Sequence, residues 1–279
     1  MSRSIFQRQE ELKGWNQSII ANLKCLVLGV GGLGTCIAMD LCRLGVKEIS
    51  LLDYDMVDYH NLNRQILFNQ NHIGQYKVDC AKEVLENFHI NNRIHRRCLW
   101  QKSSDDNIII NLDDNTKIKT YNLNALTNWQ QVIELIKKAD IVYNTIDHGD
   151  YFDVAISLAC IKYNKLMILG GTEPFYGHTI SYFLQGIKDQ DPKYLDNHHL
   201  SNKDLIQKII DNMETNDLSF IPGDVHPTIG GSTVYSAGTC SHLMVGSTIN
   251  YMMALNDETR CSPKHTIIMN LIDMSFVGW

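Results

Sequence analysis

Residues 25–34 read CLVLGVGGLG, and residues 48–53 read EISLLD. The first stretch is an apolar run that stops at a glycine cluster, and the second is an apolar run that ends in Asp53. Glycines placed in this way permit a tight turn and let backbone amides approach an anionic phosphate at a helix N-terminus. An acid about twenty residues further on is placed to hold a ribose hydroxyl. The two stretches therefore predict the first unit of a doubly wound parallel sheet.

The alternation of strands and helices continues along the chain. We expect an N-terminal helix over 4–21. Further helices are expected at 35–44, 77–87, 129–138, 152–163, 203–213 and 236–255, and further strands at 140–147, 166–169, 179–184 and 266–274. The turn residues at 111–116 favour a hairpin between 108–110 and 117–121. The predicted fold class is α/β, a Rossmann-like doubly wound sheet, mostly parallel with added antiparallel strands, with helices on both faces.

Composition excludes several classes of protein. The 279 residues are 44% hydrophobic and 20% charged, which excludes wholesale disorder. The net charge of −6 gives no basic footprint for nucleic acid. Apolar runs fall short of the roughly 20 residues that span a bilayer, and residues 1–17 lack the apolar core of a signal peptide. We therefore expect no membrane or nucleic-acid partner and a cytoplasmic location.

Eight cysteines raise the question of zinc or disulfides. No two of them form a C-x-x-C pair, so no zinc is expected. Several lie in apolar runs, where a reduced thiol packs as a small hydrophobic side chain. We expect most of them to be buried and reduced.

A second group of polar residues follows Asp53. Residues 61–68 read NLNRQILF, and residues 73–77 read IGQYK. Asn61, Arg64 and Lys77 supply an amide and two cations, which suit a chain of phosphates. Each alone would most often be a solvated surface group, but a dehydrogenase has no need for the three together.

These motifs resemble the ubiquitin-activating-enzyme superfamily, the ThiF/MoeB-type adenylyltransferases. The resemblance also includes Arg8-Gln9, TID at 145–147 and GGTEPFYG at 170–177, and it covers most of the chain. It implies an enzyme that uses ATP to adenylate the C-terminal carboxylate of a ubiquitin-like protein or peptide and releases pyrophosphate. It also implies a single adenylation domain over 1–279. Its nucleotide-binding half would span about 24–150, and its substrate-facing half about 151–279 would include a mobile crossing segment at about 188–225.

The resemblance assigns roles residue by residue. Asp53 would bind the ribose, Arg64 and Lys77 would hold phosphates, and Asp147 would coordinate Mg²⁺. Arg8 would reach the γ-phosphate from a partner subunit of a homodimer, although a helix-surface arginine is an equal reading. The remaining cofactor-binding residues would be Gly29, Gly31, Gly32, Gly34, Asp55, Asn61 and Gln65. No general base is needed, because the substrate carboxylate is ionised at neutral pH.

The sequence departs from many relatives in its cysteines. Residues 220–231, where a thioester cysteine would fall, contain none, and Cys240 lies in a helical run where a thiol is a poor nucleophile. We therefore favour adenylation without a thioester. Three alternatives remain: thioester transfer through Cys240 or Cys98, a non-catalytic nucleotide-binding partner subunit, and, more weakly, a dinucleotide oxidoreductase.

Overall fold

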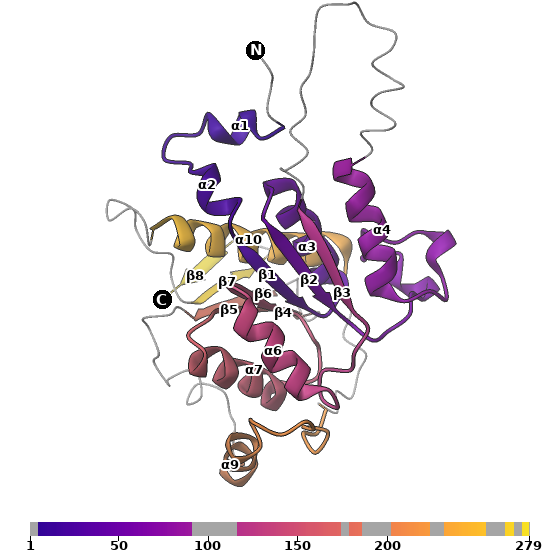
Figure 1. The fold of residues 1–279 in the computed structure, drawn as a ribbon, viewed down its shortest axis with the longest axis vertical. Helices are drawn as coiled ribbons and strands as arrows, with labels where there is room; N and C mark the ends of the chain where they lie inside the picture. Colours follow the sequence, from indigo (N-terminus) through magenta and orange to yellow (C-terminus); the bar gives the residue numbers. More distant parts are fainter. Residues whose placement is uncertain are drawn as a thin grey trace, which may run out of the picture.

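The computed structural model describes residues 5–90, 116–173, 179–185, 202–223, 232–254, 266–270 and 275–278. Within them, eight strands form one sheet in the order β3-β2-β1-β4-β5-β6-β7-β8 (Figure 1). The strands are β1 (Lys24–Leu28), β2 (Glu48–Leu52), β3 (Lys117–Tyr121), β4 (Ile141–Asn144), β5 (Leu166–Glu173), β6 (Thr179–Gln185), β7 (Thr266–Asn270) and β8 (Ser275–Gly278).

The first five strands in this order are parallel. Beyond them, β6 pairs antiparallel with β5, β7 with β6, and β8 with β7. Strand β1 pairs with β2 on one side and with β4 on the other. The chain order therefore reverses between β1 and β4. In open α/β sheets, ligands bind beyond the carboxyl ends of the strands at this switch point. The predicted Rossmann-like α/β sheet is confirmed.

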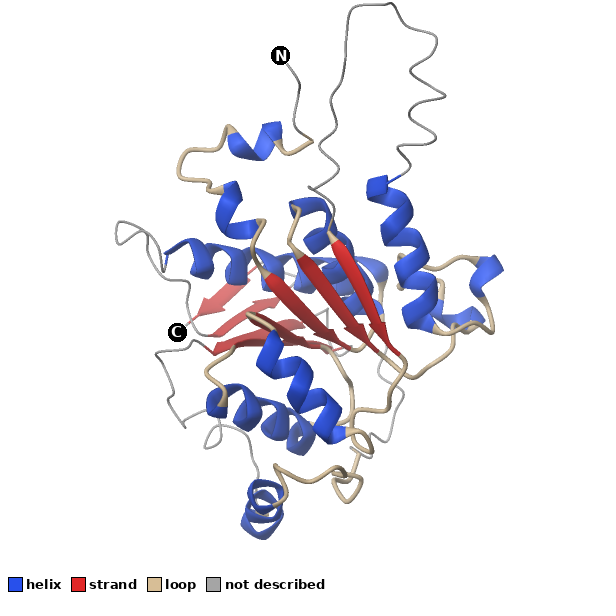
Figure 2. Ribbon diagram, in the orientation of Figure 1, coloured by secondary structure: helices blue, strands red, loops and turns tan. Residues whose placement is uncertain are grey.

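Helices cover both faces of the sheet (Figure 2). The helices are α1 (Gln7–Glu10), α2 (Gln17–Ile20), α3 (Gly32–Leu44), α4 (Lys77–Ile90), α6 (Trp129–Lys138), α7 (Asp150–Lys162), α9 (Lys203–Asp211) and α10 (Val234–Ala254), with 3₁₀ turns at Tyr59–Asn61 and Gln70–His72. Helices α3, α4 and α10 pack on one face, and α6, α7 and α9 on the other. Because successive side chains of β1 point to opposite faces, Val27 enters the first core and Leu26 the second.

The expected continuous helix over 4–21 is wrong: the segment forms two short helices, α1 and α2. Gly14 lies between the two helices, and its left-handed conformation at φ +79° breaks the predicted single helix. Asn16 then caps α2, where its Oδ1 accepts a hydrogen bond from the Ser18 N–H at 3.1 Å. The amide of Gln17 donates to the Leu44 carbonyl oxygen at 2.9 Å. The two-helix arrangement thereby fastens the amino terminus to the end of α3.

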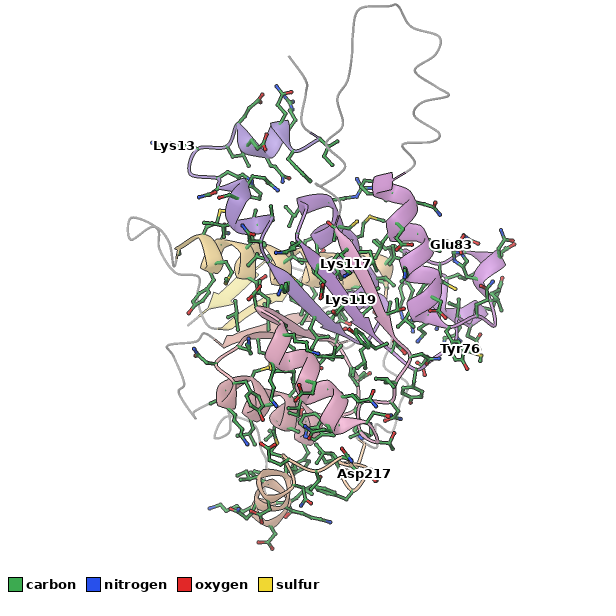
Figure 3. All side chains as sticks on the ribbon, viewed as in Figure 1. Lys13, Tyr76, Glu83, Lys117, Lys119 and Asp217 are labelled. Carbon is green, nitrogen blue, oxygen red and sulfur yellow. The ribbon has the colours of Figure 1, made fainter. Side chains whose placement is uncertain are left out.

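Strand β3 forms where expected, and its described partner is β2. It pairs in parallel with β2, while residues 108–110 of the predicted hairpin lie outside the described residues. Lys117 and Lys119 stand on this edge strand (Figure 3), and the Lys119 Nζ lies 2.7 Å from a carboxylate oxygen of Glu48. Charged side chains of this kind oppose pairing with a further strand.

Residues 202–223 belong to the predicted crossing segment, and they pack against α6 and α7. The indole N–H of Trp129 donates to the Met213 carbonyl oxygen at 3.0 Å, and Leu218 and Ile221 are buried. The rest of that segment lies outside the described residues. In the described part of the chain, no helix has the length and apolar character needed to cross a membrane.

Candidate active site

Glycine is required at two positions of the turn after β1, because another part of the backbone lies very close to each of them. Gly29 has φ +89°, and a Cβ there would lie 2.8 Å from the Thr145 carbonyl oxygen. A Cβ on Gly34 would lie 2.0 Å from the Gly29 carbonyl oxygen. At Gly31, by contrast, a Cβ would meet no atom within 4 Å. The turn therefore packs tightly against β4 at Gly29 while leaving open space at Gly31.

Asp53 lies at the carboxyl end of β2, beside this turn. Its Oδ2 accepts a hydrogen bond from the Val30 N–H at 2.7 Å, and its Oδ1 accepts one from the Asp55 N–H at 2.8 Å. Burial raises the pKa of the Asp53 carboxyl, and the nearby Lys77 and the two amide bonds oppose that rise. The carboxylate is fixed in orientation, and each oxygen retains acceptor capacity for a ligand hydroxyl.

Lys77 is the buried cation of the site. It begins α4, and its Nζ lies 2.8 Å from the Oδ2 of Asp55, whose side chain is half-exposed. A buried ammonium needs a charged or hydrogen-bonding partner, which Asp55 provides here. The pair adds one positive and one negative group to the lining of the cavity described below.

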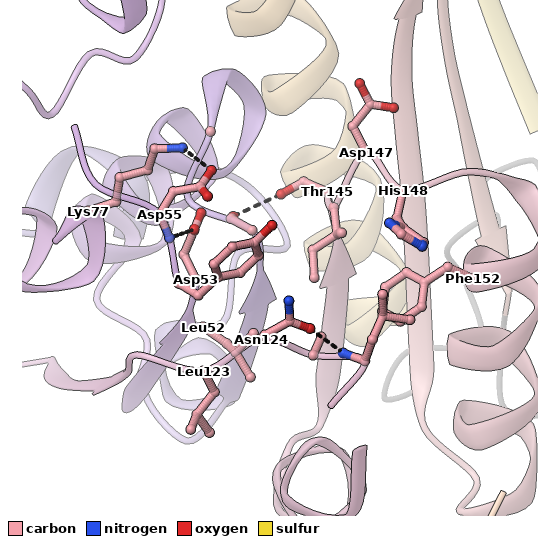
Figure 4. A pocket seen from close by; sticks show the side chains of 16 residues that line it. Leu52, Asp53, Asp55, Lys77, Leu123, Asn124, Thr145, Asp147, His148 and Phe152 are labelled. Atoms are coloured by element: carbon pink, nitrogen blue, oxygen red, sulfur yellow. Dashed lines mark hydrogen bonds and ion pairs between the residues drawn. The ribbon is translucent and has the colours of Figure 1, made fainter. Parts of the chain in front are cut away.

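A cavity of about 300 Å³ joins these groups at the carboxyl edge of the sheet (Figure 4). Six of the predicted site residues line it: Gly29, Gly31, Asp53, Asp55, Lys77 and Asp147. In Figure 4 Asp147 is drawn on the far side of Thr145 from Asp53 and Asp55. The Thr145 hydroxyl, 2.9 Å from the carbonyl oxygens of Leu28 and Gly29, links the glycine turn to the end of β4.

The predicted site residues of 61–65 are not among the described residues that line the cavity. Asn61 is buried, and its Oδ1 accepts the Asp58 N–H at 2.9 Å. The Arg64 guanidinium donates to the His60 carbonyl oxygen at 3.0 Å. The Cγ of the Arg64 side chain lies 3.6 Å from the position that a Cβ on Gly32 would occupy. The aliphatic part of Arg64 therefore lies beside the first residue of α3, while its guanidinium also donates to the Asn63 Oδ1 at 2.9 Å.

Gln65 and Arg8 have contrasting surroundings. Gln65 is buried, and its Oε1 has no hydrogen-bond partner among the described residues. Arg8 lies on α1, its side chain is 95% exposed, and its nearest acid is Glu11 at 4.0 Å. In Figure 1, α1 lies near the amino end of β1, whereas the glycine turn follows its carboxyl end. One chain does not bring Arg8 to the cavity.

The structure adds cavity residues that the sequence motifs did not indicate. Leu123, Asn124, Ala125 and Leu126 follow β3, and His148 and Phe152 follow β4. The signal was available in principle, because residues after parallel strands gather at one edge of the sheet. The hairpin predicted for 117–121 directs residues 122–126 away from this edge, which is why the sequence motifs do not indicate them.

The six cysteines in the described part of the chain are all buried and form no disulfide. Cys240 lies in α10, with its Sγ 3.9 Å from the Gly171 carbonyl oxygen, and burial raises the pKa of its thiol to about 12. Cys98 and Cys261 lie outside the described residues. The environment of Cys240 is that of a packed thiol and not of a nucleophile.

The Cys240 thiol is expected to resist alkylation in the folded protein. A pKa of about 12 lowers the thiolate fraction at pH 8 by roughly 10³-fold relative to an ordinary cysteine. Mass spectrometry of the Cys240 peptide after iodoacetamide treatment at pH 8 measures this, with the guanidinium-unfolded chain as the control. Equal labelling rates in the two states would contradict the buried assignment.

The protein has a doubly wound α/β sheet with a cavity at its switch point, and the comparison with protein families assigns this fold to a family. The family model described as ThiF family matches residues 3–271, so the chain belongs to the ThiF family.

Relatives with curated names agree with that assignment. The chain is 31% identical over 201 residues to a protein of Porphyra purpurea named "Probable molybdopterin-synthase adenylyltransferase", covering 71% of this chain and 43% of that protein. It is 29% identical over 130 residues to the molybdopterin-synthase adenylyltransferase of Salmonella typhimurium, covering 43% and 52%. It is 27% identical over 151 residues to ubiquitin-like modifier-activating enzyme 5 of Caenorhabditis elegans, covering 52% and 30%. The chain thus spans about half or less of these relatives' length.

Two solved structures share the fold. E. coli MccB, crystallised with MccA, superimposes with a TM-score of 0.67 at 17% identity over 99% of this chain and 71% of that chain. PaaA superimposes with a TM-score of 0.64 at 18% identity over 94% of this chain and 74% of that chain.

Proposed function

We propose that this chain transfers AMP from ATP to the C-terminal carboxylate of a ubiquitin-like protein or a peptide and releases pyrophosphate. The names of its relatives, which are adenylyltransferases and modifier-activating enzymes, support this class of reaction. The likeness to MccB, whose structures include MccA, agrees with a macromolecular or peptide substrate.

The observation that carries the proposal is the arrangement of Asp53 and the open glycine turn in one cavity. The Asp53 carboxylate is immobilised by two backbone amides beside the space at Gly31. A ribose hydroxyl can donate to Asp53 while phosphates lie over the turn at the start of α3, where helix amides and dipole favour negative charge.

Adenylation is then an electrostatic task. The substrate carboxylate attacks the α-phosphorus, the bond to the bridging oxygen of the β-phosphate breaks, and that oxygen leaves as part of pyrophosphate. Negative charge builds on the phosphoryl oxygens and on the leaving group. Lys77 lines the cavity, and Arg64 contacts Gly32 at the start of α3, which supports a role for both cations in stabilising that charge.

The donor set of the cavity fits Mg²⁺ held together with nucleotide. Asp147 is an exposed carboxylate that lines the cavity, and it has no hydrogen-bond partner among the described residues. The described residues contain no group of three or more His, Cys, Asp or Glu side chains that could hold a metal alone. Mg²⁺ is commonly bound by one or two carboxylates plus phosphate oxygens, so Asp147 would hold it. When bound, the ion would neutralise phosphate charge.

Arg8 belongs to the proposal only through a second copy of the chain. It is exposed and does not line the cavity of its own chain. In a homodimer whose interface brings α1 to the partner's cavity, Arg8 would add a further cation at the γ-phosphate.

Arg64→Ala is expected to slow adenylation by about 10²–10³-fold, because the variant loses a cation at the phosphates. ATP–pyrophosphate exchange measures the rate. The matched control is Arg43→Ala at the carboxyl end of α3, where the guanidinium lies 4.1 Å from the centre of the Phe88 ring. Normal exchange in Arg64→Ala would remove Arg64 from the phosphate site.

The experiment that tests the proposed function is the same exchange assay run against peptides that end in glycine or asparagine. Exchange that depends on a free C-terminal carboxylate would support the enzyme. Nucleotide binding with no exchange for any carboxylate would support the non-catalytic partner subunit. A covalent adduct sensitive to reducing agent, lost in Cys240→Ser or Cys98→Ser, would support thioester transfer.

A further inference from the structure

The cavity extends past Asp53 into an apolar part formed after β3. Leu52, Leu123, Ala125 and Leu126 line this part, and Asn124 is the polar side chain among them. Ligand sites combine an apolar lining with a few precisely placed polar groups that fix orientation and specificity. Asn124 is therefore the group to examine for recognition of a base.

The orientation of the Asn124 amide is fixed by the backbone. The side-chain Oδ1 of Asn124 accepts a hydrogen bond from the Leu126 backbone N–H at 2.9 Å. The backbone carbonyl oxygen of Asn124 accepts one from the side-chain Nδ2 of Asn128 at 3.0 Å. Because the oxygen is occupied by a backbone donor, the other end of the amide is the NH₂ group. Figure 4 shows this nitrogen pointing away from the Leu126 bond, to the side on which Asp53 lies. No described residue accepts a hydrogen bond from it.

The sheet determines which part of a nucleotide would meet this donor. Adjacent strand ends are separated by about 4.8 Å. The glycine turn follows β1, Asp53 follows β2, and Asn124 follows β3, and the Asp53 N–H donates to the Tyr121 carbonyl oxygen at 3.2 Å. With phosphates at the turn and the ribose at Asp53, as in the proposed function, the base would lie over the residues that follow β3. The edge of the base farthest from the ribose would then face Asn124.

We propose that the Asn124 side-chain amide selects adenine by donating a hydrogen bond to its N1. This inference rests on the proposed function and names the base that the same cavity takes. At that edge adenine presents N1 as an acceptor, whereas hypoxanthine presents N1–H as a donor. The NH₂ group of Asn124 pairs with the first and opposes the second.

Asn124→Asp is the sharpest test, because it keeps the oxygen that accepts the Leu126 N–H and replaces the donor by an acceptor. Asn122→Asp is the matched control: it adds the same charge at an exposed position in the same loop that does not line the cavity. Isothermal titration of the full chain with ATP and with ITP gives the ratio of the two affinities. The ratio cancels the general repulsion between an added carboxylate and a triphosphate.

The unmodified chain and Asn122→Asp are expected to prefer ATP over ITP by about tenfold, and Asn124→Asp is expected to shift that ratio toward ITP by at least about tenfold. An unchanged ratio in Asn124→Asp, or a preference for ITP in the unmodified chain, would overturn the role of Asn124 and leave the proposed function standing. Failure of the unmodified chain to bind either nucleotide would overturn both.

Discussion

Gly34→Ala is expected to leave no stably folded protein, although alanine ordinarily stabilises a helix interior relative to glycine. The added Cβ would stand 2.0 Å from the Gly29 carbonyl oxygen, and a backbone atom cannot move aside as a side chain can. The change therefore forces the first turn of α3 away from β1. We expect a loss of more than about 4 kcal/mol, seen as insoluble expression or a melting temperature lower by about 10 °C or more.

Two other glycines provide controls for this prediction. Gly31→Ala places its Cβ in open space within the cavity, so the melting temperature should stay near that of the unmodified chain while ATP affinity falls. Gly246→Ala in α10 meets no atom within 4 Å and should stabilise the protein by about 0.5–1 kcal/mol. Circular dichroism melts of the three variants separate these effects. A normal melt for Gly34→Ala would show that the turn does not need the close approach.

Asp147→Ala is expected to abolish Mg²⁺-dependent turnover while leaving ATP binding in the absence of metal largely intact. Asp147 is exposed and makes no hydrogen bond or ion pair with another described residue, so its removal should not disturb the cavity walls. Metal stabilisation of transition-state charge is worth several kcal/mol, which corresponds to a loss of about 10³-fold in ATP–pyrophosphate exchange.

Asp150→Ala is the control for Asp147, because it removes another exposed carboxylate three residues along the chain that does not line the cavity. Titration of ATP with and without Mg²⁺ gives a second measurement. In Asp147→Ala the added Mg²⁺ should no longer tighten ATP binding, whereas in Asp150→Ala it should. Unchanged metal dependence in Asp147→Ala would return that residue to a structural role at the end of β4.

The sequence predicted those parts of the site whose conformation is determined by residues close to one another in the chain. Residues 25–34 and Asp53 define their own turn and strand ends, because glycine conformation and strand hydrophobicity depend on neighbours in the chain. Leu123 and Asn124 escaped prediction because their position depends on β3 pairing in parallel with β2, a long-range contact that no local pattern encodes. The single N-terminal helix failed for a local reason, the left-handed conformation of Gly14.

The support of the glycine turn by α10 has a consequence for the way the protein is made. Every described residue that lines the cavity lies in the range Gly29 to Phe152. Helix α10 supports the turn from much later in the chain: Ala237 stands against Gly32, and the Ser241 hydroxyl donates to the Leu33 carbonyl oxygen at 3.1 Å. A nascent chain therefore carries all the described residues of the cavity long before the ribosome has synthesised the helix that supports the turn. During that interval the apolar face of α3 lacks its cover, and this is the stage at which chaperone capture or aggregation competes with folding.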